Sequence, residues 1–231
     1  MSKYFALIPA AGTGSRMGNA MPKQYQPING RPMLWHALFP FNLHPRIERM
    51  FVVLSPTDAW FAQMRWDEFK SKLEVLRCGG ESRAQSVLNG LQVMAGGLVQ
   101  DDQVLVHDAA RPCLTRHAID QLMSQVADNE AGGLLAEPLA DTLKRADESG
   151  HVLRTEPRER LWRAQTPQMF RYDVLVRALS AGTLEDLTDE ASAVERLGLS
   201  PFLVKSDATN LKVTYAEDLH LAEAILNNRA S

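Results

Sequence analysis

Short runs of apolar residues recur along the chain and alternate with longer stretches of helical spacing. The runs cover Tyr4–Ile8, Met50–Leu54, Leu73–Leu76, Val104–His107, Gly133–Ala136 and Phe202–Val204. Continuous apolar runs of this length are typical of strands that are buried on both faces of a parallel sheet. We therefore expect these runs to form the strands of one covered sheet.

The stretches between the runs predict helices. Ser82–Met94 lines one face with apolar residues, and Thr115 is a suitable N-cap for the next amphipathic stretch. Pro32 favours a helix start, and Pro40 should end or kink that helix. The pattern Thr214-x-x-Glu217 predicts a capping box at the start of a last helix. Strands alternating with helices indicate an α/β fold with helices on both faces of the sheet.

One polar stretch, Leu139–Glu156, interrupts this alternation. Two β-like runs flank Asp147–Gly150, which is a turn signal. The stretch predicts a β-hairpin with little apolar surface of its own. An isolated hairpin is marginally stable in water, so a partner subunit is the natural surface for it to pack on. A solvated surface hairpin remains the alternative.

Composition and charge narrow the class of protein. The 231 residues are 45% hydrophobic and 23% charged, with a formal net charge of −3. We expect a single domain over residues 1–231. The mild acidity argues against a nucleic-acid partner but still allows a local basic pocket. Met1–Pro9 is too short for a signal peptide or a membrane span, and two cysteines without a metal-binding motif favour a reducing, cytoplasmic location.

Candidate chemistry begins directly after the first run. Pro9–Gly18 reads PAAGTGSRMG, and its glycines allow a ligand to approach the backbone closely. The glycine spacing departs from the dinucleotide fingerprint, which disfavours an NAD-linked oxidoreductase. The loop also lacks the lysine that a P-loop carries, so the pattern excludes that motif. Arg16 lies inside this loop and Lys23 follows it, and two cations beside such a loop suit a polyphosphate.

These motifs resemble one family. Pro9-Ala-Ala-Gly-x-Gly-x-Arg-Met17 and Pro22–Tyr25 are similar to the signature of the 2-C-methyl-D-erythritol 4-phosphate cytidylyltransferases, enzymes of the non-mevalonate isoprenoid pathway. The resemblance continues in order through Gly79–Val87, Val106–Pro112, Asp141–Lys144, Gln165–Gln168, Thr188–Ala191 and Asn210–Thr214. It implies a Rossmann-like, mostly parallel sheet of the nucleotidyltransferase type, with a protruding hairpin arm over residues 139–160.

The resemblance also implies a reaction. CTP and methylerythritol 4-phosphate would give the diphosphocytidyl product and pyrophosphate, by in-line attack of a substrate phosphate oxygen on the α-phosphorus of CTP. The catalytic cations carried over are Arg16, Lys23 and Lys212. The nucleotide-binding residues carried over are Pro9, Ala10, Ala11, Gly12, Gly14, Gly80, Glu81, Arg83, Ser86 and Ala109.

The residues implied for the polyol phosphate are Asp108, Arg111, Thr142, Arg158, Thr166 and Thr188. Asp108 ends a predicted strand at the sheet edge where ligands bind, and it is the candidate ligand for Mg²⁺. The family's arm crosses to a neighbouring subunit, so Thr142 and Arg158 would serve the partner's site in a homodimer. His107 is expected to be a hydrogen-bonded structural residue, because the attacking phosphate needs no base.

Three other functions stay open. A cytidylyltransferase for another polyol phosphate, such as ribitol 5-phosphate, would share the CTP half of the site. A sugar-1-phosphate nucleotidyltransferase is a more distant possibility. A non-catalytic CTP-binding module is a different class, and it would not need Arg16, Lys23, Asp108 and Lys212 together.

Overall fold

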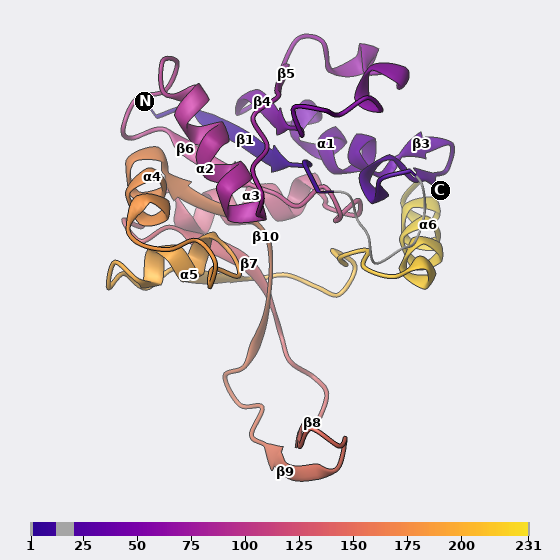
Figure 1. Ribbon diagram of the computed structural model, residues 1–231, viewed down its shortest axis with the longest axis vertical. Helices are drawn as coiled ribbons and strands as arrows, with labels where there is room; N and C mark the ends of the chain where they lie inside the picture. Colours follow the sequence, from indigo (N-terminus) through magenta and orange to yellow (C-terminus); the bar gives the residue numbers. More distant parts are fainter. Residues whose placement is uncertain (1, 13–20, 231) are drawn as a thin grey trace.

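A computed structural model of the chain describes residues 2–12 and 21–230 (Figure 1). Its main sheet has the strand order β11-β7-β10-β6-β1-β4-β5. The strands are β1 (Tyr4–Pro9), β4 (Ile47–Val53), β5 (Leu73–Leu76), β6 (Gln103–Val106), β7 (Gly133–Pro138), β10 (Trp162–Arg171) and β11 (Phe202–Lys205). All pairs are parallel except those of β10, which runs antiparallel to both β6 and β7.

The six expected strands are confirmed, and β10 is the strand that the apolar pattern missed. Its sequence carries polar Gln165, Thr166 and Gln168 and also Pro167, which cannot donate to a ladder. The pairing of β10 with β7 is interrupted between Ala164 and Gln168, where this segment leaves the ladder. The interruption places these polar residues beside the end of β6.

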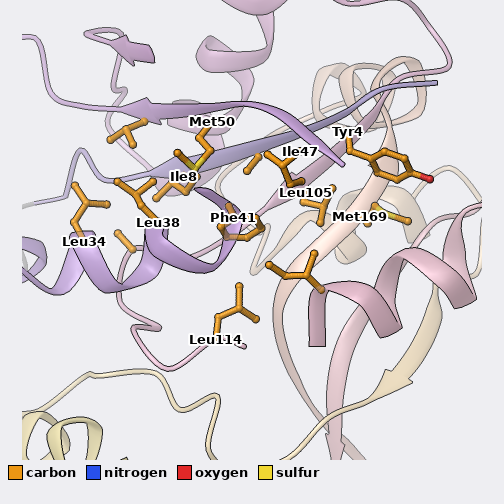
Figure 2. Close-up of a cluster of buried hydrophobic side chains, with 14 of the residues drawn as sticks. Tyr4, Ile8, Leu34, Leu38, Phe41, Ile47, Met50, Leu105, Leu114 and Met169 are labelled. Carbon is orange, nitrogen blue, oxygen red and sulfur yellow. The ribbon is translucent and has the colours of Figure 1, made fainter. Parts of the chain in front are cut away.

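Helices cover both faces of the sheet, as expected. On one face lie α1 (Met33–Leu43) and α3 (Arg116–Val126), and on the other lie α2 (Arg83–Met94), α4 (Tyr172–Ser180) and α5 (Glu190–Glu195). Tyr4, Ala6 and Ile8 of β1 point to the first face, which Figure 2 shows filled with apolar side chains. Phe5 and Leu7 point to the second. This alternation explains why β1 is apolar without interruption.

Two helix ends bear on the sequence-based expectations. Pro40, expected to end or kink its helix, lies inside α1, which continues to Leu43, so of the two expected effects it does not end the helix. The last helix, α6 (Ala216–Ala230), has no Thr214–Glu217 box. Instead the carboxylate of Asp218 accepts the backbone N–H groups of Thr214 and Tyr215, because the helix starts two residues after Thr214. The caps of α2 by Ser82 and of α3 by Thr115 are confirmed.

Short elements complete the fold. They are β2 (Pro27–Ile28), β3 (Arg31–Pro32) and the 3₁₀ turns η2 (Lys23–Tyr25), η3 (Phe61–Gln63) and η4 (Asp67–Phe69). Helix α6 packs beside β2 and contributes Ala222 to a small third core. No helix within residues 2–12 and 21–230 combines the length and the apolar character needed to cross a membrane.

The predicted hairpin is present as an arm. β8 (Leu143–Ala146) and β9 (Val152–Glu156) form their own two-stranded sheet, and the chain reaches them through extensions of β7 and β10 (Figure 1). Val152 and Leu153 are each 61% exposed. The arm therefore projects from the sheet with apolar side chains open to its surroundings.

Candidate functional site

A cavity of about 430 Å³ opens at the carboxyl ends of the parallel strands. Ligands bind at this edge in open α/β sheets. Its lining comes from β1, η2, the start of α2, the segment after β6 and the segment after β11. The lining residues are Pro9, Ala10, Ala11, Gly12, Lys23, Gln24, Gly80, Glu81, Ser82, Arg83, Ser86, Asp108, Ala109, Ala110 and Lys212. The fold thus brings most of the predicted nucleotide site together. Gly14 and Arg16 lie outside the described residues.

Gln24 fixes the segment that leaves β1. Its buried side-chain amide donates to the carbonyl oxygens of Ala10 at 2.9 Å and Gly12 at 3.0 Å. Among the described residues, no atom lies within 4 Å of a Cβ built at Gly12, and Gly12 lines the cavity. The arrangement holds a stretch of backbone open to a ligand. Gln24 was not predicted as a site residue, although it lies inside the Pro22–Tyr25 motif.

The loop opposite is held by glycine packing and by Ser86. A Cβ at Gly79 would lie 2.8 Å from the carbonyl oxygen of Leu54 and would collide with the Cβ of Ala11. Ser86 accepts the N–H of Gly80 at 3.0 Å and donates to the carbonyl of Ser82 at 2.9 Å. Because its hydroxyl is engaged in these two hydrogen bonds, Ser86 fixes the conformation of the loop at the cavity wall.

Two predicted cations reach the cavity from segments far apart in the sequence. Lys23 Nζ donates to the carbonyl oxygen of Val213 at 2.8 Å, across 190 positions of sequence. The neighbouring Lys212 places its Nζ 2.8 Å from Oδ2 of Asp108. The first contact ties the segment after β1 to the segment before α6, and the second ties that segment to the residues after β6, with both ammonium groups at one cavity.

Asp108 lies at the centre of a cluster of charges. Its Oδ1 accepts from Nε of Arg83 at 2.8 Å, its Oδ2 pairs with Lys212, and Nε of Arg111 lies 3.8 Å from Oδ2. Burial alone would raise the pKa of Asp108, but the charges of Arg83 and Lys212 outweigh it and hold that pKa well below its usual range. Asp108 is therefore an ionised carboxylate that organises the surrounding cations.

Arg83 is shared between two carboxylates. Besides its contact with Asp108, its Nη1 and Nη2 donate to the two oxygens of Glu190 at 2.5 and 3.0 Å. Burial would lower the pKa of Arg83, but Glu190 and Asp108 raise it. Glu190 is buried at the start of α5, within the Thr188–Ala191 motif, and was not predicted as a site residue.

A smaller cavity of about 200 Å³ adjoins the first and shares Arg83, Asp108 and Lys212 with it. It also contains the predicted Arg111, Thr166 and Thr188, with Ala164, Gln165, Gln168 and Asp189. The buried guanidinium of Arg111 donates to the carbonyl oxygens of Asn210 at 2.6 Å and Ala164 at 3.3 Å, while its Nε has no hydrogen-bond partner among the described residues. Two cavities that meet at three charged side chains can hold two anionic ligands side by side.

Thr166 uses its hydroxyl within the protein. Oγ1 accepts the N–H of Asp108 at 3.0 Å and lies 2.9 Å from Nδ1 of His107, whose Nε2 faces the carbonyl oxygen of Arg111 at 3.1 Å. A neutral His107 with its proton on Nε2 satisfies all of these contacts, because Thr166 then donates to Nδ1. Burial lowers the pKa of His107 to about 4, which favours this neutral form. The expectation of a hydrogen-bonded histidine is confirmed.

Thr142 and Arg158 stand apart from both cavities. Both are exposed residues of the arm, and Arg158 donates to the carbonyl oxygen of Ala140 within that arm. Neither is among the described residues that line the two cavities. Their implied contribution to a partner's site stays a prediction.

The donor set does not fit a metal ion held by the protein alone. No three His, Cys, Asp or Glu side chains gather as a metal site in the part of the chain that the structure describes. Both oxygens of Asp108 already face cations at 2.8 Å, and a divalent ion would have to displace Arg83 or Lys212 to bind there. Asp207, the acid that shortly precedes Asn210 in the sequence, accepts the N–H of Thr209 in an exposed turn.

The doubly wound sheet, with a cation-lined pair of cavities at its carboxyl edge, defines a nucleotidyltransferase. Residues 4–228 match the IspD family, 2-C-methyl-D-erythritol 4-phosphate cytidylyltransferase, and the chain belongs to that family. It is 58% identical to the 2-C-methyl-D-erythritol 4-phosphate cytidylyltransferase of Nitrosospira multiformis over 230 residues, which is 99% of each chain.

Solved structures agree with this assignment. A crystal structure of 4-diphosphocytidyl-2C-methyl-D-erythritol synthase superposes with a TM-score of 0.86 at 41% identity, covering 98% of this chain and 99% of the other. The Francisella tularensis 2-C-methyl-D-erythritol 4-phosphate cytidylyltransferase gives a TM-score of 0.83 at 34% identity, covering 97% of this chain and 100% of the other. The expected family and the expected fold class are confirmed.

Proposed function

We propose that this chain transfers CMP from CTP to 2-C-methyl-D-erythritol 4-phosphate, giving 4-diphosphocytidyl-2-C-methyl-D-erythritol and pyrophosphate. The observation that carries this proposal is the junction of two cavities at Arg83, Asp108 and Lys212. One cavity is large enough for a nucleotide and the other suits a small phosphorylated polyol. The reacting atoms of the two substrates would meet at the shared wall.

The larger cavity would hold CTP. Ala10, Ala11 and Gly12 offer backbone to the nucleotide on one side, and Gly80 and Glu81 offer it on the other. Backbone groups on a fixed loop can read the edge of a pyrimidine while the cavity wall excludes a larger base. Lys23 and Lys212, with Arg16 from the glycine loop, would neutralise the triphosphate.

The chemistry needs charge stabilisation and no covalent intermediate. A phosphate oxygen of the polyol substrate forms a bond to the α-phosphorus of CTP while the bond to the β-phosphate oxygen breaks in line, and pyrophosphate leaves with the electron pair. Lys23 and Lys212 approach the place where negative charge accumulates during this step, and preorganised cations lower the barrier there.

The smaller cavity would bind the polyol phosphate. Arg111 and Lys212 supply positive charge to it, and Thr188 lines its wall. Thr166 would contribute mainly through the position it gives to Asp108, since its hydroxyl is already engaged.

Magnesium would enter with CTP as the counter-ion of its phosphates. This assignment is supported by the saturated carboxylate of Asp108, which leaves a divalent ion better ligands on the triphosphate than on the protein.

The arm would complete the site of a second subunit in a homodimer. Support comes from its exposed apolar side chains and from the distance of Thr142 and Arg158 from the cavities of their own chain. A cytoplasmic location is supported by the two unpaired cysteines, Cys78 and Cys113.

A pyrophosphate-release assay tests the reaction directly. CTP, UTP, ATP and GTP are each combined with methylerythritol 4-phosphate or ribitol 5-phosphate, with and without Mg²⁺. We expect release with CTP, methylerythritol 4-phosphate and Mg²⁺ together. Release only with ribitol 5-phosphate would support the other cytidylyltransferase instead, and CTP binding without release from any pair would support a binding module.

A further inference from the structure

Glu190 is a buried acid that the proposed reaction does not use. It is 1% exposed, and it lines neither of the two cavities. Removing a carboxylate and a guanidinium from water costs several kcal/mol each, and the cost is offset only by close, well-aligned pairing. The pair of Glu190 with Arg83 is therefore a costly way to join the first turns of α5 and α2, and its geometry indicates a further role.

The neighbouring backbone holds Glu190 rigidly. Gln168 of β10 accepts the N–H of Ala191 at 2.8 Å and donates to Asp189 Oδ2 at 2.9 Å. Asp189 also caps α5 by accepting the N–H of Ser192 at 2.9 Å. These bonds fix the first turn of α5 against the sheet, so the carboxylate of Glu190 is presented from a rigid support.

From this support Glu190 reaches the site through one residue. Its two oxygens accept Nη1 and Nη2 of Arg83 at 2.5 and 3.0 Å, which fixes the plane of the guanidinium. With that plane fixed, Nε of Arg83 points at Oδ1 of Asp108 at 2.8 Å. The other oxygen of Asp108 holds the ammonium of Lys212 at 2.8 Å. A continuous chain of charged contacts thus runs from α5 to the wall shared by the cavities.

We propose that Glu190 is a positioning residue for the transfer step. By anchoring Arg83, it sets the place of Asp108 and, through Asp108, the place of the Lys212 ammonium where the two substrates meet. The charge of Glu190 also matters. Because Arg83 is shared between two carboxylates, it attracts Asp108 less strongly, and Asp108 stays available to pair with Lys212. This proposal rests on the proposed function, since the positioned groups are those assigned to the reaction.

The test compares Glu190→Gln, Arg83→Gln and the double variant with the wild type, and uses Glu195→Gln as a matched control. Glu195 is on the same helix but exposed. Glutamine keeps the shape at position 190 but turns an N–H group toward the guanidinium, so one anchor of Arg83 is lost. For each protein, kcat, the KM for each substrate and the melting temperature are measured. Wild-type turnover in the same assay establishes the reaction independently of the variants.

We expect kcat of Glu190→Gln to fall at least about tenfold while its KM for CTP changes less than about threefold, because Glu190 does not line the nucleotide cavity. The double variant should be no more than about twofold slower than Arg83→Gln, since Glu190 acts only through Arg83. This variant also avoids an unpaired buried charge, so it remains informative if Glu190→Gln folds poorly. Glu195→Gln should match the wild type.

Three results would overturn the proposal. One is a wild-type kcat for Glu190→Gln. Another is a loss that disappears when rates are normalised to the folded fraction, which would mark a purely structural acid. The third is full additivity in the double variant, which would show that Glu190 does not act through Arg83.

Discussion

Lys23 follows the glycine-containing segment in the sequence and lies at the nucleotide cavity. Its ammonium is half-buried, faces the nucleotide cavity and is held 2.8 Å from the carbonyl oxygen of Val213. A cation fixed before the substrate arrives needs no reorganisation during the reaction, which is the condition under which such groups contribute most.

Lys23→Ala should therefore lower kcat about 10²–10³-fold, the usual loss for one preorganised donor. The melting temperature should change little, because the Lys23 side chain is half-buried at the cavity and is not part of the apolar core. Steady-state kinetics at saturating CTP and a thermal melt measure the two effects. Lys70→Ala, at an exposed position away from the cavities, serves as the control. Wild-type turnover of Lys23→Ala would contradict the role given to this lysine.

His107 should make stability depend on pH. Burial lowers its pKa from 6.5 to about 4 in the folded protein. The unfolded chain therefore takes up a proton between about pH 6.5 and 4 while the folded protein does not, so stability falls as the pH is lowered through this window. This pKa shift corresponds to a loss on the order of 3 kcal/mol in the free energy of unfolding as the pH falls through that window.

Urea unfolding at several pH values between 4 and 7 measures this dependence. His107→Asn should flatten the slope of the free energy of unfolding against pH, because it removes the titrating group while an amide oxygen can still accept from Thr166. His151→Asn, at an exposed site on the arm, should leave the slope unchanged. Equal slopes in the wild type and His107→Asn would contradict the assignment.

Charged and glycine-containing motifs could be located from the sequence because they follow the order and spacing of the family that the chain resembles. Lys23, Arg83, Asp108 and Lys212 were all identified and are brought to one cavity. Gln24 and Glu190 were missed. Their roles depend on which backbone carbonyl or guanidinium lies opposite them, and that is decided by the packing of distant elements rather than by local spacing.

Strands buried on both faces were the most predictable elements. The apolar runs of β1, β4 and β6 are continuous because each face of the sheet is covered by helices. Strand β10 was not predicted, since its middle carries Gln165, Thr166 and Pro167. Gln165 and Thr166 are polar for a functional reason, because both line the smaller cavity and Thr166 also accepts the N–H of Asp108. The apolar pattern therefore did not predict β10, because polar residues of this strand contribute to the candidate site.

The loop after β5 offers a test of how packing shapes the nucleotide cavity. Gly79→Ala would place a methyl group 2.8 Å from the carbonyl oxygen of Leu54 and against Ala11, forcing the two cavity walls apart. Overpacking of this kind costs about 1–3 kcal/mol. We expect a rise of roughly tenfold in the KM for CTP, with a smaller effect on the KM for the polyol phosphate.

Gly96→Ala is the matched control for this variant. A Cβ at Gly96 would meet nothing within 4 Å, and the residue is exposed just after α2. Its kinetics should equal those of the wild type. An unchanged KM for CTP in Gly79→Ala would show that the contact between this loop and Ala11 does not shape the nucleotide site.

The whole molecule combines a compact sheet domain with an arm that its own domain does not cover (Figure 1). The net charge of −3 describes the chain as a whole, whereas Lys23, Arg83 and Lys212 gather at one cavity. Overall charge therefore argued against a nucleic-acid partner but did not reveal the local site. The arm sequence predicted a hairpin, but a sequence without its partner does not show what the hairpin contacts.

Subunit complementation tests the proposed role of the arm. In a heterodimer of Lys23→Ala and Arg158→Ala chains, one site combines both defects and the other is intact. Mixing the two variants should thus recover about a quarter of wild-type activity, if subunits pair at random in a twofold dimer. Each variant alone is the control. No recovery after verified subunit exchange would contradict an arm that acts across the interface.

The central claim is that CTP and the polyol phosphate meet at the wall shared by the two cavities. A crystal structure with CTP, Mg²⁺ and a non-reactive analogue of methylerythritol 4-phosphate measures this directly. We predict the cytosine beside Gly80, the α-phosphate between Lys23 and Lys212, and the analogue phosphate beside Arg111. A nucleotide bound elsewhere, or an analogue whose phosphate does not face the α-phosphorus, would contradict the account.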